Sequence, residues 1–232
     1  MVNYLGNFDF EKLITQHQNI KRKLKRLKKN GNYSDKCCPD QLVGKMVDGD
    51  FIEVCRQNID YQTMSGKNYV NNKLSSPIAI VLESPHRDEF DANGYPIGPA
   101  MGSTGTLFFK NFVKAINKSN NINLKSGTYD IVLINSIQYQ CSLGENLDKN
   151  DDNQKQRDIN WILCFIHEDS CDIERRLKAL SPFATINLCT KGKGSGLSNL
   201  RQLLERKIGS MINYTSGNHP SSWRNQRNTV IN

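Results

Sequence analysis

No stretch of this sequence approaches the length of a membrane-spanning segment. A transmembrane helix needs about 20 mostly apolar residues in a row, and the apolar runs here are far shorter. The first residues, Met1–Gly6, also lack the basic and apolar regions of a secretory signal. We therefore expect a cytoplasmic protein without a membrane partner.

The positions of the cysteines and histidines indicate neither a disulfide framework nor a zinc site. The seven cysteines are an odd number, and they lie scattered in mostly apolar contexts such as Leu163–Phe165. This usage is typical of reduced core cysteines rather than of a secreted, cross-linked domain. No cysteine or histidine spacing matches a zinc site.

Acidic residues are scarce where basic ones gather. The net charge is +8 and the pI about 9.1, while the hydrophobic fraction of 37% is ordinary for a folded domain. No acid follows Glu205, and none interrupts the lysines and arginines of residues 21–29. A basic surface favours DNA as the partner, although a basic protein without a nucleic-acid partner remains the alternative on charge alone.

The chain contains no internal repeat, and 232 residues suffice for one α/β domain. We expect residues 1–76 to form a basic helical region flanking the core, with helices over residues 10–29 and around 41–55. The core is expected over residues 77–232. Its four apolar, β-branched runs are residues 78–82, 130–134, 184–188 and 212–214, and helical patterns containing Phe108, Ile173 and Leu197 separate them.

Strands that alternate with helices predict parallel pairing and helices on both faces of the sheet. The expected fold is therefore a three-layer α/β/α arrangement around a central four-stranded, mainly parallel sheet. In such sheets the functional crevice lies at the carboxyl ends of the strands. Polar clusters follow all four predicted strands, at residues 83–88, 135–140, 190–196 and 216–223.

These clusters resemble the motifs of one enzyme family. Residues 81–86, with the glycine-rich segments 94–98 and 102–105, resemble motif one of the uracil-DNA glycosylase superfamily, closest to its Gly-Glu-Ala-Pro-Gly branch. Residues 133–136 resemble the strand whose asparagine reads the flipped base, and His219-Pro220-Ser221 resembles the motif near the C-terminus. The resemblance covers about residues 77–225 and implies a monofunctional DNA glycosylase.

The sequence departs from the family pattern at four positions that bear on the substrate. Leu82 stands for a glycine, Ser84 for an aspartate or asparagine, Ile97 for a stacking phenylalanine, and His86 for a tyrosine. The base is therefore left open between uracil and a bulky modified cytosine of phage DNA, the latter implying an antiviral role.

Excision of a base needs a carboxylate near C1′ and donors aimed at the leaving base. We assign the carboxylate to Glu83, with Asp88 in reserve, the base-reading amide to Asn135, and the donor to His219, with His86 as the alternative. The structural alternatives are a capping acid, a turn asparagine and a structural histidine. The expected base pocket comprises Ser84, Pro85, His86, Ile97 and Gly98.

Further residues are assigned to DNA binding through phosphates or as a wedge in the duplex. The loop at 191–196 suits a phosphate but lacks the spacing of a nucleotide-binding P-loop. Trp223 or Arg224 is the expected wedge, and the Lys21–Lys29 segment is equally well a solvated helix face. The full set is Lys191, Lys193, Ser195, Ser221, Ser222, Trp223, Arg224, Lys21 and Lys25.

No cofactor and no obligatory protein partner are expected. Some members of the resembling branch carry a four-cysteine iron–sulfur cluster, but Cys37 and Cys38 are adjacent, which makes joint ligation with Cys141 and Cys164 awkward. No lysine occupies a motif position, so a Schiff-base lyase step is not expected. The alternative functions are a non-catalytic nucleic-acid-binding protein of the same fold and a hydrolase of free nucleosides or nucleotides.

Overall fold

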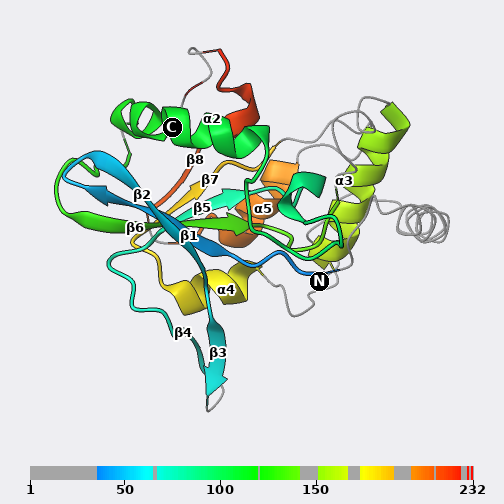
Figure 1. Ribbon diagram of the computed structural model, residues 1–232, viewed down its shortest axis with the longest axis horizontal. Coiled ribbons are helices and arrows are strands. Elements are labelled where there is room, and N and C mark those ends of the chain that lie inside the picture. Colours follow the sequence, from blue (N-terminus) through cyan, green and yellow to red (C-terminus); the bar gives the residue numbers. More distant parts are fainter. Residues whose placement is uncertain are drawn as a thin grey trace.

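The computed structural model describes residues 36–64, 67–119, 121–141, 151–166, 173–190, 200–211, 213–225, 229 and 231. The predicted helix over residues 10–29 therefore lies outside the described residues. The described elements, labelled as in Figure 1, are β1 Gln41–Val47, β2 Asp50–Asn58, β3 Tyr61–Met64, β4 Lys67–Val70, β5 Ile78–Leu82, η2 Arg87–Glu89, α2 Ser103–Asn117, β6 Thr128–Asn135, α3 Asp151–Ile166, α4 Ile173–Leu180, β7 Ala184–Asn187, α5 Leu200–Ile208, β8 Tyr214–Ser216 and η3 Pro220–Ser222.

The centre of the molecule is a mixed six-stranded sheet with the strand order β2-β1-β6-β5-β7-β8. Three of the strands predicted from apolar runs are present as β5, β6 and β7; the fourth, β8, begins at Tyr214, where the predicted run 212–214 ends, and these four strands pair in parallel. The expected four-stranded sheet is wrong in size, because β1 and β2 extend it with antiparallel pairing. Strands buried on both faces read as continuous apolar runs, which is why β5, β6 and β7 were visible in the sequence.

The helix predicted around residues 41–55 is wrong, because this segment is the β1–β2 hairpin. Its two-residue turn is Asp48-Gly49, and both residues have positive φ, at 48° and 92°. Asp-Gly between strands is a strong hairpin signal, since its conformation matches the twist of the paired strands. β1 and β2 belong to the central sheet, so residues 41–58 are part of the sheet itself rather than of a helical region beside it.

Helices cover both faces of the sheet (Figure 1). On one face, α2 packs Phe108 and Phe112 into a cluster with Ile78, Ile80 and Leu133. On the other face, α3, α4 and α5 contribute Trp161, Leu177 and Leu204 to a second cluster. The described part of the chain is therefore a three-layer α/β/α fold, as predicted.

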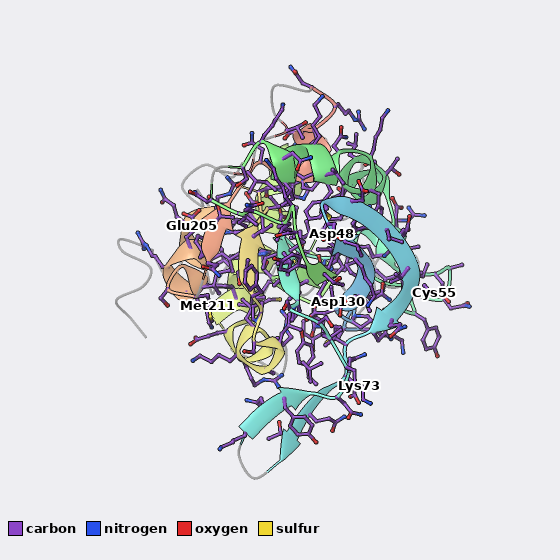
Figure 2. The ribbon with its side chains drawn as sticks, turned by 90° about the vertical axis from the view of Figure 1, so that its left-hand side faces the viewer. Asp48, Cys55, Lys73, Asp130, Glu205 and Met211 are labelled. Atoms are coloured by element: carbon purple, nitrogen blue, oxygen red, sulfur yellow. The ribbon has the colours of Figure 1, made fainter. Side chains whose placement is uncertain are left out.

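Two further features frame the core. The β3–β4 hairpin projects from the body of the molecule, in the direction of Lys73 in Figure 2. Asp130, also labelled in Figure 2, is buried near the start of β6, where it pairs with Lys45 at 3.0 Å and accepts the Ser75 amide at 2.6 Å. Among the described helices, none has the length and apolar character needed to cross a bilayer.

Candidate functional site

The candidate site lies at the carboxyl edge of the parallel strands. The register places Leu82 beside Asn135, Val81 beside Asn187, and Asn187 beside Ser216. The polar segments that follow β5, β6, β7 and β8 therefore leave the sheet at one edge, as the parallel topology predicts. Glu83, Asn135, Thr190 and His219 lie at or just after the strand ends on this edge, and the Thr190 hydroxyl contacts Glu83.

Glu83 is held through both its side chain and its backbone. Its side chain is buried, with the residue only 7% exposed. The Thr190 hydroxyl donates to Oε2, and Arg157 Nε lies 3.4 Å from Oε1. The Glu83 carbonyl accepts from the Ser136 hydroxyl and from Trp161 Nε1, the latter at 3.1 Å. These contacts hold both the carboxylate and the backbone of Glu83 just beyond the end of β5.

One half of the Asn135 amide is hydrogen-bonded and the other half is not. The residue is 1% exposed, and Nδ2 donates to Glu89 Oε2 at 2.9 Å. Its Oδ1 has no hydrogen-bond partner among the described residues. A buried acceptor without a donor is unfavourable by roughly 1–3 kcal/mol. The geometry is therefore suited to a ligand that offers an N–H group at this point.

Glu89 is the functional candidate that sequence reasoning missed. It is 5% exposed, and besides Asn135 it contacts the Cys38 thiol, whose Sγ lies 3.7 Å from Oε2. Burial raises the pKa of Glu89 to about 7, against the opposing effect of the hydrogen bond from Asn135. Its neighbours Arg87 and Asp88 are exposed, and nothing in the local sequence shows that η2 turns only Glu89 inward.

We predict that Glu89→Gln removes a pH dependence of stability. Because the folded-state pKa of Glu89 is raised to about 7 from 4.5, its stabilisation is full below pH 4.5 and is lost as the pH rises through 7. The free energy of unfolding should therefore fall by about 3 kcal/mol over that window in the wild type. Urea unfolding at several pH values measures this slope, which should flatten in Glu89→Gln.

The exposed acid Glu53 on β2 supplies the matched control. Glu53→Gln should keep the wild-type slope. A Glu89→Gln variant with the same slope as the wild type contradicts the buried, uncharged state of Glu89.

His219 adopts one defined tautomer. Its Nδ1 accepts from the backbone N–H of Ser221 at 3.3 Å and lies 2.8 Å from the Ser221 hydroxyl. The proton of the neutral ring is therefore on Nε2. His219 is half-buried by its solvent exposure. Desolvation, followed by the positive charges of Arg201 and Arg157, lowers the pKa of His219 to about 4. The ring is consequently a neutral donor at physiological pH.

The other residues of the predicted base pocket lie in the loop between β5 and α2, which is held by backbone hydrogen bonds. Pro85 and Gly98 are buried, whereas Ser84 and His86 are half-buried and Ile97 is 44% exposed. The Ile97 amide donates to the Glu89 carbonyl at 2.8 Å, and Gln41 Nε2 donates to the Ile97 carbonyl at 2.9 Å. The loop therefore fixes the backbone of Ile97 next to Glu89.

Two of these positions have a local structural role. Gly98 has a φ of 147°, and a Cβ there would lie 2.0 Å from Gln41 Oε1, so a side chain does not fit. His86 caps η2, because its Nδ1 accepts the Asp88 amide at 3.3 Å. His86, the alternative donor, and Asp88, the reserve acid, are therefore in contact with each other.

The predicted DNA-binding residues divide into three groups. Trp223 is 1% exposed and stacks on Phe108 at a ring-centre distance of 6.3 Å, so it packs in the core and its predicted role as a wedge is wrong. Arg224 and Ser221 are exposed, and the half-buried Ser222 donates to the His219 carbonyl at 2.8 Å. The others, Lys191, Lys193, Ser195, Lys21 and Lys25, lie outside the described residues.

A buried ion pair supports the backbone at Asn135. Arg176 on α4 bonds both oxygens of Asp40, at 2.7 and 2.6 Å. Its Nη2 also donates to the carbonyls of Asn135 and Ser136, at 2.8 and 3.2 Å. Asp40 further accepts from the Tyr61 hydroxyl at 2.7 Å. The end of β6 is therefore held by a side chain from α4.

Three of the four cysteines considered for a cluster have contacts of two separate kinds. Cys38 faces Glu89, and Cys141 lies beside Cys164, whose hydrogen bond raises the pKa of the Cys141 thiol. In the described part of the chain, no group of three or more ligating side chains is arranged to hold a metal ion.

Comparison of the chain with family models, with curated proteins and with solved structures gave no match.

Proposed function

We propose that the protein is a monofunctional DNA glycosylase of the uracil-DNA glycosylase type. The observation that carries this proposal is the Asn135 amide. It is buried at the end of a parallel strand, where it pairs with Leu82, the residue before Glu83; its Nδ2 is bonded to Glu89, and its Oδ1 has no partner among the described residues. Enzymes that excise bases read the hydrogen-bonding edge of an extruded nucleotide with such fixed groups. The N3–H of uracil or the 4-amino group of cytosine would satisfy this acceptor.

The other two residues supply what bond cleavage requires. As the N-glycosidic bond breaks, positive charge develops on the sugar and negative charge on the base. The Glu83 carboxylate would orient the attacking water and offset the positive charge, as carboxylates do in sugar hydrolysis. The neutral His219 ring would donate its Nε2 proton as a hydrogen bond to the base oxygen. A water molecule then adds to C1′, and the base leaves with a proton.

Charge and exposure support DNA as the substrate rather than a free nucleoside. The net charge is +8, and the lysines of α2 and Arg224 after η3 are exposed. Such groups bind phosphates without reading sequence. The exposed Ile97 in place of a stacking aromatic favours a pocket open enough for a bulky modified pyrimidine, and a role against phage DNA follows from that substrate.

The test is an excision assay on a panel of duplexes. The duplexes carry uracil, hypoxanthine or glucosylated hydroxymethylcytosine at one position, and alkali converts any abasic site to a strand break. We expect breaks with at least one pyrimidine and none with hypoxanthine. Asn135→Ala should lose this activity while binding DNA with the wild-type salt dependence.

Two outcomes would count against the proposal. DNA binding with no abasic site on any duplex would favour the alternative, a non-catalytic nucleic-acid-binding protein. Cleavage of free nucleosides without action on duplexes would favour a small-molecule hydrolase.

A further inference from the structure

Two buried asparagines end the strands on either side of β5, and their hydrogen bonding differs. Asn187, at the end of β7, is fully bonded: its Nδ2 donates to the Tyr214 hydroxyl at 3.0 Å, and its Oδ1 accepts the Cys189 amide at 3.0 Å. Asn135, at the end of β6, has an Oδ1 without a partner among the described residues. Buried polar groups are normally paired, so Asn187 has the bonds of a structural asparagine and Asn135 does not.

The other polar groups of Asn135 are held from two directions. Its carbonyl accepts from Arg176 Nη2 at 2.8 Å, and its Nδ2 donates to Glu89 Oε2 at 2.9 Å. The bond from Arg176 fixes the backbone only. The bond to Glu89 therefore decides which half of the Asn135 amide is left without a partner.

The surroundings of Glu89 favour one orientation of this amide. The Cys38 thiol donates to the same oxygen, Oε2, at 3.7 Å, and both residues are buried. If the amide were turned round, Asn135 Oδ1 would face Oε2, which would then have to carry a proton and donate it. The Cys38 thiol would lose that acceptor. The observed orientation satisfies both donors, and the proton of an uncharged Glu89 is then held by Oε1.

We propose that Glu89 is a positioning residue that fixes the Asn135 amide so that the site presents an acceptor and not a donor. The consequence for excision rests on the proposed glycosylase function, whereas the orientation of the amide does not. Through Asn135, Glu89 restricts the substrate to bases that carry an N–H group at this point, such as the N3–H of uracil or the 4-amino group of cytosine.

The first test observes the amide by NMR in the DNA-free protein. The side-chain N–H signals of Asn135 are assigned by their loss in Asn135→Ala. We expect a nuclear Overhauser effect between these protons and the β protons of Cys38, because both side chains donate to one oxygen. Glu89→Gln retains an acceptor oxygen and should keep this effect. Glu89→Met removes both oxygens at similar side-chain length and should abolish it.

The second test measures the single-turnover rate of base excision in the same variants. Glu89→Met should lower the rate by about tenfold to 100-fold, because a turned amide loses its hydrogen bond to the base, whereas Glu89→Gln should keep most of the rate. Adding Glu89→Met to Asn135→Ala should cause no further loss, since Glu89 acts through this amide alone. Tyr214→Phe is the matched control: it removes the Nδ2 partner of Asn187 and should leave the rate nearly unchanged.

The outcomes separate this inference from the proposed function. Absence of the Overhauser effect in the wild type, or its persistence in Glu89→Met, overturns the orientation. Equal losses of rate in Glu89→Gln and Glu89→Met, or losses that multiply in the double variant, overturn the positioning role. An inactive wild type with the expected NMR result defeats the glycosylase proposal and leaves the orientation standing. If Glu89→Met does not fold, a large loss of rate in Glu89→Gln with the Overhauser effect retained overturns the role.

Discussion

Glu83→Gln is expected to lower the single-turnover rate of base excision by about 10²–10⁴-fold. The substitution preserves the volume of the side chain, so packing at the end of β5 is retained. What is lost is the negative charge that orients water and offsets the charge on the sugar. The affinity for the same duplex, measured by fluorescence anisotropy, should stay near the wild-type value, because a buried carboxylate does not bind phosphates.

Asp88 provides the control for this experiment. It is an acid of the same loop with a side chain 54% exposed, and it contacts His86. Asp88→Asn removes one negative charge a few residues away and should leave the excision rate nearly unchanged. A large loss in Asp88→Asn with normal activity in Glu83→Gln would transfer the carboxylate role to the reserve acid.

The parallel core and its functional edge were predictable from the sequence for one physical reason. A strand buried on both faces is mostly apolar, so Ile78–Leu82 and the strand runs at 130–134 and 184–188 stood out. Parallel pairing then forces their carboxyl ends to one edge. Asn135 and Glu83 become neighbours through that rule alone, without any knowledge of their side-chain contacts.

The β1–β2 hairpin was missed although its signal was present. Asp48-Gly49 is a turn sequence of the required type, but the flanking residues mix apolar and polar types without strict alternation. Strand β1 lies between β2 and β6 and is buried along most of its length, whereas β2 is at the edge. The two strands therefore follow different patterns, and neither repeats at period two over its full length.

The residues that complete the site could not be predicted, because distant segments create their roles. Arg157 meets Glu83 only once α3 packs on the sheet, and Glu89 acquires its environment from Cys38 and Asn135. Trp223 shows the reverse case. Its place after the histidine motif suggested a surface role, but Trp223 packs against Phe108 of α2 in the core.

Arg176→Met is expected to lower the free energy of unfolding by about 3–5 kcal/mol. Arg176 is 1% exposed and Asp40 is fully enclosed with it. Truncating the guanidinium leaves a buried carboxylate without its counter-charge, and the carbonyls of Asn135 and Ser136 lose their donor. Urea unfolding near neutral pH measures the change, and because β6 ends at Asn135, base excision should fall as well.

Two companion variants show whether the buried pair is responsible. Lys178 lies on the same helix and forms an exposed pair with Glu174 at 2.6 Å, so Lys178→Met should change stability by less than about 0.5 kcal/mol. Adding Asp40→Asn to Arg176→Met removes the uncompensated charge and should restore part of the loss, since the two residues are coupled. A double variant that is no more stable than Arg176→Met would contradict the ion-pair explanation and point to packing alone.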